Sequence, residues 1–240
     1  MAPGYLVCTH PRSGSSYVCQ LLASTGVLGK PLEYFNAPYM RRRGADDYPD
    51  SPDEQVRYLL DHSATGNGVR AGKLFYFDLE RLGGQRLLAQ LRGFAFVYLE
   101  RTDKLAQAIS ISRAWRSGQI TADAPAPAAE PEYIYKDVRQ RLVRLLQAEQ
   151  KWDGFFRSSG ANVVRSRYED VMANPQSIAD QVAQAIGVQE PAPVDPAAVT
   201  LRVQRDELSG QWYRRFVAET RVAEPGLLRF CPDADNTPDH

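Results

Sequence analysis

The sequence of 240 residues predicts an α/β fold with a central parallel sheet. Four short runs are almost continuously apolar, which is typical of strands covered on both faces. Segments with helical apolar periodicity lie between these runs, and strands that alternate with helices favour a parallel sheet. The apolar content of 43% and the charged content of 24% are ordinary for a soluble globular protein.

The predicted strands are residues 5–10, 69–77, 94–99 and 162–168. The first strand runs directly into a loop rich in serine and glycine. After this loop, an apolar stripe that includes Val18 and Leu22 recurs at helical spacing until Gly26 ends the pattern. This part of the sequence therefore predicts a strand, a tight loop and a helix in succession.

Three further helices are predicted at residues 103–116, 138–156 and 175–186. The apolar stripe of the first of them consists of Leu105, Ala108, Ile111 and Trp115. Asp103 can cap this helix at its start, and Gly187 ends the third helix. The core is expected to include all three tryptophans, Trp115, Trp152 and Trp212.

We expect one domain over residues 1–220 and a loosely ordered tail over residues 221–240. The formal net charge of zero argues against a broad nucleic-acid-binding surface. No signal peptide is visible, and no apolar run approaches the about 18 residues that a membrane span needs. Cys8 and Cys19 lie in apolar segments and Cys231 in a polar one, so we expect free thiols in a reducing, cytoplasmic compartment.

Three stretches have an irregular pattern, residues 41–53, 121–131 and 189–196. The first two lie close in sequence to the candidate site elements described below. They are therefore either loops that bind an acceptor or plain solvent-exposed connections.

The first chemical signal is the loop between the first strand and the first helix. Its polar and flexible residues are Arg12, Ser13, Gly14, Ser15 and Ser16. Unpaired N–H groups at a helix start bind phosphate-like groups, and an arginine fork suits a tetrahedral anion. The loop lacks the Gly-Lys-Ser/Thr of a nucleotide triphosphatase, so a magnesium-assisted phosphate site is disfavoured.

The second signal is Arg101 with Ser110. Arg101 directly follows the third predicted strand, and Ser110 lies off the apolar stripe of the helix that comes next. Together the two side chains can hold one phosphate group. Without the first loop, they would be ordinary surface residues.

Taken together, these signals resemble the bacterial trehalose 2-sulfotransferase family of PAPS-dependent carbohydrate sulfotransferases (PAPS is 3′-phosphoadenosine-5′-phosphosulfate). The matching segments are residues 5–7, the loop 11–16, residues 25–27, the run Pro31-Leu32-Glu33-Tyr34-Phe35-Asn36, Gly72-Lys73-Leu74, residues 101–110 with Ala114 and Trp115, Tyr168-Glu169-Asp170, and residues 204–216. The alanine- and proline-rich tract after Gln119 and the three arginines at 41–43 depart from the family pattern. We therefore do not carry trehalose over as the acceptor.

The resemblance implies a P-loop-like three-layer α/β/α fold and transfer of a sulfuryl group from PAPS to a carbohydrate or glycolipid hydroxyl, with release of PAP. It implies that Arg12, Ser13, Gly14, Ser15 and Ser16 hold the 5′-phosphosulfate, that Arg101 and Ser110 hold the 3′-phosphate, and that Glu33 is the general base. Arg12 would also act on the charge that develops during transfer. A homodimer is implied as well, and no metal ion.

Several alternatives stay open at this point. His10 is a second candidate base. Glu33 can instead pair with Lys30 or the arginine cluster, and Lys73 can either approach the sulfuryl oxygens or close a strand. Arg41, Arg42 and Arg43 suit either a solvated face or an anionic acceptor. A P-loop-type nucleotide kinase and a non-catalytic PAPS- or PAP-binding module remain the competing functions.

Overall fold

The structure is a computed structural model, and it describes residues 3–119, 130–201 and 207–231. It consists of two compact units, and we describe each by itself. The first unit contains Met1–Glu100 and Lys151–Thr200, and the second contains Arg101–Gln150 and Leu201–His240. The predicted boundary between a domain over residues 1–220 and a tail stays a prediction.

The first unit is built on a parallel sheet with the strand order β2-β1-β3-β4. The strands are β1 (Gly4–Thr9), β2 (Arg70–Phe75), β3 (Phe94–Glu100) and β4 (Val163–Arg167). Every residue of β1 is buried, because this strand pairs with β2 on one side and with β3 on the other. The prediction of a parallel sheet is therefore confirmed, and the prediction of strands covered on both faces is confirmed for β1, β2 and β3 and wrong for β4, an edge strand in which only Ser166 is buried.

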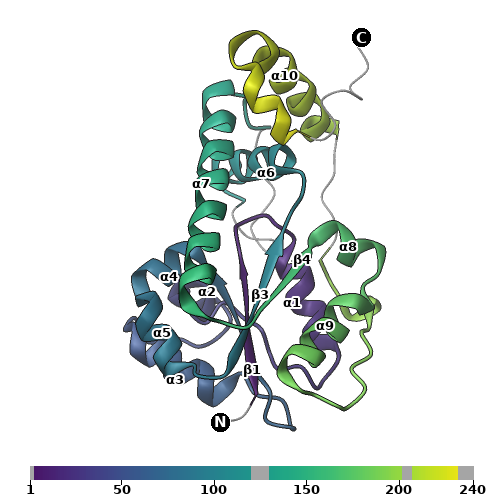
Figure 1. The fold of residues 1–240 in the computed structure, drawn as a ribbon. Coiled ribbons are helices and arrows are strands. Elements are labelled where there is room, and N and C mark those ends of the chain that lie inside the picture. Colours follow the sequence, from purple (N-terminus) through teal and green to yellow (C-terminus); the bar gives the residue numbers. More distant parts are fainter. Residues whose placement is uncertain (1–2, 120–129, 202–206, 232–240) are drawn as a thin grey trace. The chain divides into compact units, whose positions relative to one another are not determined.

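Helices cover both faces of this sheet (Figure 1). One face of β1 presents Leu6 and Cys8 to a layer made by α2 (Ala37–Arg42), α3 (Pro52–His62), α4 (Tyr76–Leu82), α5 (Gly84–Gln90) and the end of α7 (Tyr135–Ser159). The other face presents Tyr5 and Val7 to α1 (Ser15–Ser24), α8 (Tyr168–Ala173) and α9 (Gln176–Ile186), with η1 (Pro196–Ala198) beyond. This arrangement is the predicted three-layer α/β/α fold.

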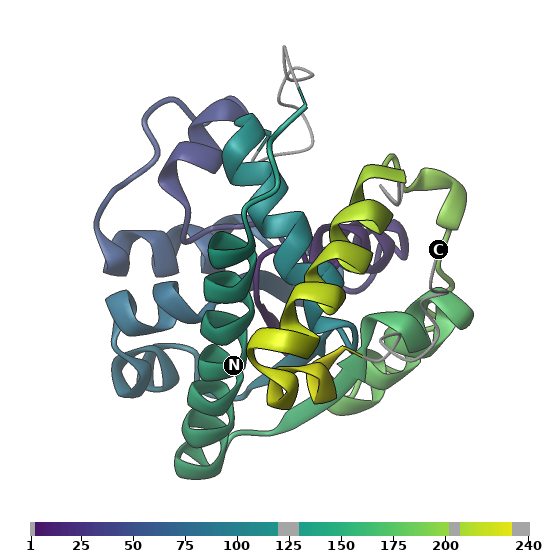
Figure 2. The ribbon, with the colours of Figure 1, turned by 90° about the horizontal axis from the view of Figure 1, so that it is seen from above.

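The second unit has its own apolar core, formed by α6 (Lys104–Ser117), the first part of α7 and α10 (Glu207–Ala223). Helix α10 lies beside α6 (Figure 2). The prediction that Asp103 caps α6 is confirmed, because its carboxylate accepts a hydrogen bond from the Ala106 N–H at 2.8 Å. Within the expected tail, residues Pro225–Phe230 form the 3-10 helix η2, and Cys231 is buried.

The tryptophan prediction is confirmed at two positions and wrong at one. Trp152 and Trp212 are buried, whereas Trp115 is 58% exposed and lies under the guanidinium of Arg141, 5.5 Å from its ring centroid. An apolar stripe predicts which face of a helix is buried, but it does not predict how far along the helix the covering elements extend. Trp115 lies in the last turn of α6, beyond the buried part of the stripe.

The other differences lie at element ends and in short helices. The second strand ends at Phe75, because α4 begins with Tyr76. The irregular stretch 41–53 contains the end of α2 and the start of α3. Residues 121–129 of the alanine- and proline-rich tract lie outside the described residues. None of the described helices has the length and apolar character of a membrane-spanning segment.

Trp152→Ala should lower the free energy of unfolding by about 3–5 kcal/mol, because the ring is fully buried against Tyr76, Tyr98 and Phe156. The matched control is Trp115→Ala, which removes an exposed ring and should cost no more than about 1 kcal/mol. Urea denaturation of the two variants and the wild type measures both values. Equal losses would contradict the assignment of the two tryptophans.

Candidate functional site

The candidate site lies at the carboxyl edge of the sheet in the first unit. The strands are parallel, so the segments that follow β1, β2 and β4 all leave from this edge. The loop after β1, Phe75 at the end of β2 and Tyr168 after β4 are the residues found there. Ligands of open α/β sheets bind outside this edge.

The loop after β1 has an unusual backbone. Gly14 has φ 85° at the N-cap of α1, and Arg12, with φ 62°, is the one non-glycine residue with positive φ in the part of the chain that the structure describes. The Ser13 hydroxyl is buried 2.6 Å from the Thr9 hydroxyl, which donates to the Leu99 carbonyl at 3.0 Å. Ser13 therefore ties the loop to β1 and β3 from inside.

Gly14 brings the backbone close to Tyr168. A Cβ atom at this position would lie 2.2 Å from the Tyr168 ring, so even alanine does not fit without a shift. Gly14 makes no side-chain cap for α1, and the N–H groups at a helix start are the donors that attract anions. The start of α1 therefore has no side-chain cap, as the predicted anion loop requires.

Three side chains from different elements form a hydrogen-bonded chain beside this loop. The Lys73 ammonium donates to Glu33 Oε1 at 2.8 Å and to Ser16 Oγ at 3.0 Å. Lys73 comes from β2 and is 4% exposed, and its ion pair with Glu33 is therefore largely shielded from water. The structure thus brings the predicted base, Glu33, together with the predicted anion loop through Lys73.

Backbone pairing fixes the position of Glu33. Leu32 forms a parallel bridge with Gly72, and its carbonyl accepts a hydrogen bond from the Lys73 N–H at 2.8 Å. Side chains alternate along β2, so Lys73 lies on the same face as Ala71, the face that α1 covers. Glu33 and Lys73 are 40 residues apart in sequence, and this short bridge places them side by side.

Asn36 holds the second carboxylate oxygen of Glu33. Its Nδ2 donates to Glu33 Oε2 at 2.9 Å, while its Oδ1 accepts from the Tyr39 N–H at 3.1 Å and caps α2. The sequence prediction did not single out Asn36 as a site residue. An asparagine two positions before Pro38 is a signal for a helix start, and this signal would have identified it.

The alternatives left open by the sequence have these structural outcomes. Glu33 pairs with Lys73 rather than with Lys30 or an arginine. His10 is buried, with its ring edge-on to Tyr98 at 6.4 Å. Arg41 binds the Tyr48 carbonyl and Asp50, each at 2.8 Å, so this arginine is engaged in the structure of its own segment.

Cys8 and Cys19 are buried, as predicted, and Cys231 is buried as well. Burial raises the pKa of the Cys19 thiol to about 12, although the Lys73 ammonium nearby lowers it. Burial also raises the pKa of Cys231 to about 11. Both thiols are therefore protonated at neutral pH and are not nucleophiles.

Arg101 and Ser110 belong to the second unit. Arg101 directly follows β3, and Ser110 lies in the first half of α6, half-buried. Arg12, Ser13, Gly14, Ser15, Ser16 and Glu33 all belong to the first unit. The structure therefore brings the loop and Glu33 together within the first unit. Arg101 and Ser110 lie in the second unit, so the predicted link between them and the loop stays a prediction.

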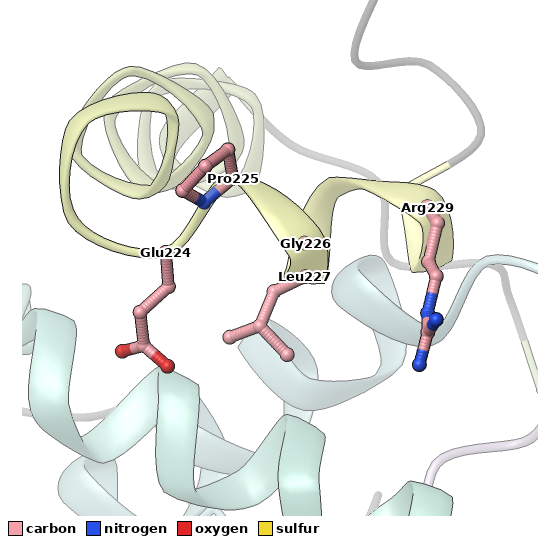
Figure 3. A pocket seen from close by; sticks show the side chains of 5 residues that line it. All are labelled: Glu224, Pro225, Gly226, Leu227 and Arg229. Carbon is pink, nitrogen blue, oxygen red and sulfur yellow. The ribbon is translucent and has the colours of Figure 1, made fainter.

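The second unit also contains a hollow of about 340 Å³, lined by Glu224, Pro225, Gly226, Leu227 and Arg229 (Figure 3). Both carboxylate oxygens of Glu224 bind the guanidinium of Arg139. This charge pair raises the pKa of Arg139 and lowers the pKa of Glu224. None of the predicted site residues lines the hollow, so we do not assign it to the reaction.

Comparison with known proteins identifies the family. The family model described as Stf0 sulphotransferase matches residues 4–62 and 63–219. The chain belongs to the Stf0 sulphotransferase family. It is therefore a sulfotransferase, which confirms the sequence prediction and disfavours the nucleotide kinase.

Two relatives are similar over most of their length. The trehalose 2-sulfotransferase of Mycobacterium tuberculosis (strain ATCC 35801 / TMC 107 / Erdman) is 28% identical, over 90% of this chain and 94% of that protein. The trehalose 2-sulfotransferase of Mycolicibacterium smegmatis (strain ATCC 700084 / mc(2)155) is 26% identical, over 88% and 93%. A crystal structure of retinol dehydratase in a complex with retinol and PAP shares the fold, with a TM-score of 0.53 and 14% identity over 100% of this chain and 83% of that one.

Gly14→Ala should destabilise this sulfotransferase more than Gly26→Ala, a control at the other end of α1. Both glycines have a left-handed φ, 85° and 69°, which costs any other residue about 1–2 kcal/mol. Only Gly14 faces a ring, so overpacking should add about 1–3 kcal/mol there. Thermal or urea unfolding of both variants measures the difference, and equal costs would show that Tyr168 does not confine the loop.

Proposed function

We propose that this sulfotransferase transfers a sulfuryl group from PAPS to a hydroxyl of an uncharged carbohydrate or of a glycolipid. The observation that carries the proposal is the chain from Ser16 through Lys73 to Glu33. It joins the predicted anion loop to a carboxylate that can accept a proton. Both similar relatives are named trehalose 2-sulfotransferases, which supports a sugar as the acceptor.

The loop after β1 suits the 5′-phosphosulfate group of PAPS. Gly14 keeps the start of α1 clear of a side chain, and Ser16 is an exposed hydroxyl in the first turn of that helix. We assign the 5′-phosphosulfate to Arg12, Ser13, Gly14, Ser15 and Ser16. The buried Ser13 hydroxyl bonds to Thr9, so its contribution is the loop shape and its backbone N–H.

We assign the 3′-phosphate to Arg101 and Ser110. Arg101 precedes the capped start of α6, where the helix dipole also favours an anion. Family membership and the order of the two motifs along the chain support this assignment. The proposal includes no metal ion, because a transferring sulfuryl group carries less negative charge than a phosphoryl group.

The proposed chemistry is an in-line displacement. PAPS supplies the sulfuryl group, and PAP leaves with the electron pair of the broken S–O bond. Glu33 takes the proton of the acceptor hydroxyl as its oxygen bonds to sulfur. Lys73, between Glu33 and Ser16, donates to a sulfuryl oxygen, while Arg12 and the loop N–H groups stabilise the charge that grows on the 5′-phosphate.

Phe77 is the proposed platform for the acceptor. Its ring is 55% exposed and stacks on Phe75, with centroids 5.2 Å apart and an interplanar angle of 15°. The Lys73 ammonium lies 4.9 Å from the centroid of Phe75, so the aromatic pair is continuous with the Lys73–Glu33 pair. An exposed aromatic face binds the apolar C–H face of a sugar ring, and this observation favours an uncharged acceptor.

The proposal also includes a cytoplasmic location and a homodimer. A reducing, cytoplasmic compartment is supported by the three cysteines, which are all free thiols. The homodimer rests on the family resemblance alone.

Glu33→Gln should lower turnover by about 10²–10⁴-fold and keep the affinity for PAP, because it removes the base while the amide oxygen can still accept the hydrogen bond from Lys73. Arg101→Ala should instead weaken the binding of PAP, because it removes the proposed partner of the 3′-phosphate. Calorimetric titration of PAP and a radiolabelled PAPS assay with trehalose and related sugars measure the two effects. The matched control is Glu54→Gln, an exposed carboxylate of α3.

Three results would contradict the proposal. Folded wild type that binds no PAP would remove the donor assignment. Wild type that binds PAP and sulfates no sugar would remove the acceptor class. Undiminished turnover of Glu33→Gln would remove the base.

Phe77→Ala should raise the KM for the acceptor sugar by about 10-fold, the size of a lost aromatic contact of about 1.4 kcal/mol. The KM for PAPS should stay unchanged, because Phe77 lies on the acceptor side. Phe77→Tyr keeps the ring and is the matched control. Equal KM values for Phe77→Ala and the wild type would show that the ring is not the acceptor platform.

A further inference from the structure

Arg81 of α4 reaches the segment that carries Glu33. Its guanidinium donates to the Phe35 carbonyl at 2.7 Å and to Gln55 Oε1 at 2.8 Å. Phe35 is two residues after Glu33, and Gln55 belongs to α3. One side chain therefore joins the backbone of the Glu33 segment to two helices of the layer that covers it.

The neighbouring peptide is held in the same way. The Tyr48 hydroxyl donates to the Tyr34 carbonyl, and both of these tyrosines are buried. Gln55 in turn donates to the Pro49 carbonyl at 2.9 Å. The carbonyls of the two residues after Glu33 are thus bound by side chains of distant segments, so the backbone there has little freedom to move.

Asp78 orients Arg81. It lies one turn before Arg81 on α4, with its carboxylate 3.6 Å from the guanidinium, and its side chain is 6% exposed. Asp78 is three residues after Phe75, where β2 ends, and it lies close enough to Glu33 to interact with its charge. A buried carboxylate costs free energy unless it is paired, and Arg81 is the partner.

We propose that Arg81 and Asp78 are positioning residues for Glu33. Arg81 fixes the backbone at Phe35 so that the Glu33 carboxylate meets Lys73 and the acceptor hydroxyl, and Asp78 holds the guanidinium in place. The inference rests on the proposed function, since it assigns a role to residues that touch neither donor nor acceptor. It goes beyond that function by placing control of the base in a different layer of the fold.

The charge state of Asp78 makes this role pH-dependent. Burial and, to a smaller extent, the charge of Glu33 raise the pKa of Asp78, while Arg81 and a hydrogen bond with the Phe75 backbone lower it, and together they bring it to about 7. The charged groups that act on Asp78 are therefore Arg81 of its own helix and Glu33 of the neighbouring segment, and Glu33 is itself paired with the Lys73 ammonium. The ionised form binds Arg81 more strongly, so Arg81 is held best above pH 7.

The experiment compares Asp78→Asn and Arg81→Lys with the wild type, using PAPS and trehalose or whichever sugar the wild type sulfates. We expect kcat to fall by about 10–100-fold, because a small misplacement of a reacting group has an effect of this size. The affinity for PAP should change less than about twofold. The wild-type kcat should rise through about pH 7, and Asp78→Asn should lack this rise.

Matched controls are Arg86→Lys and Asp53→Asn. Arg86 of α5 pairs with Asp53 of α3 in the same helical layer, but this pair is on the surface. Both control variants should keep the kcat and the pH profile of the wild type. A loss of stability without a change in kcat would assign Asp78 and Arg81 a structural role only, which overturns the proposal.

Stability provides a second measurement, independent of activity. The pKa of Asp78 is higher in the folded than in the unfolded protein, so folding takes up a proton and stability falls as pH rises from 3.8 through about 7. Asp78→Asn should lack this fall, and the same slope in both proteins would contradict the burial of a titrating Asp78. Wild type that sulfates no sugar would instead overturn the proposed function and this inference with it, whereas active wild type with unaffected variants overturns the inference alone.

Discussion

The site depends on one buried charge, the ammonium of Lys73. It is 4% exposed, and a buried ammonium is costly unless its protons are bound. Glu33 and Ser16 bind it, and they come from the segment that bridges to β2 and from the first turn of α1. Satisfying this charge therefore requires the anion loop, the β2 register and the Glu33 segment to be correctly placed at once.

The sheet sets these three positions. Because β1 pairs in parallel with β2, Val7 lies opposite Lys73, and the loop after β1 leaves the sheet at the same edge. Gly72 faces Leu59 and Leu6 on the opposite face, where a Cβ atom would lie 2.5 Å from the Leu59 side chain. Close packing on one face of β2 thus accompanies a charged site on the other.

The sequence was sufficient to predict the parallel sheet, because apolar runs alternate with helical segments along the chain. It was also sufficient to predict the loop at Arg12–Ser16 and the capped start of α6, because each of these depends on residues that are neighbours in the chain. It left the partner of Glu33 open, since the pair with Lys73 depends on the bridge between Leu32 and Gly72. It gave no indication of Arg81, whose contacts reach back to Phe35 and Gln55. Trp115 was misplaced for a related reason: a helical stripe does not encode which other elements cover it.

In the proposed site, the donor loop and the base depend on different kinds of interaction. This difference explains why the loop could be predicted from the sequence and the partners of the base could not. The donor loop relies on backbone N–H groups and on a φ of 85° at Gly14, so its signature is a short local motif. The proposed base relies instead on charged side chains that are distant in sequence: Lys73, which also contacts the donor loop, and behind it Asp78 and Arg81. A buried charge lowers stability unless its partners are in place, and buried ionisable groups are concentrated at functional sites. The nearly buried charges of Lys73 and Asp78 beside Glu33 therefore support the proposal that this carboxylate takes part in the reaction.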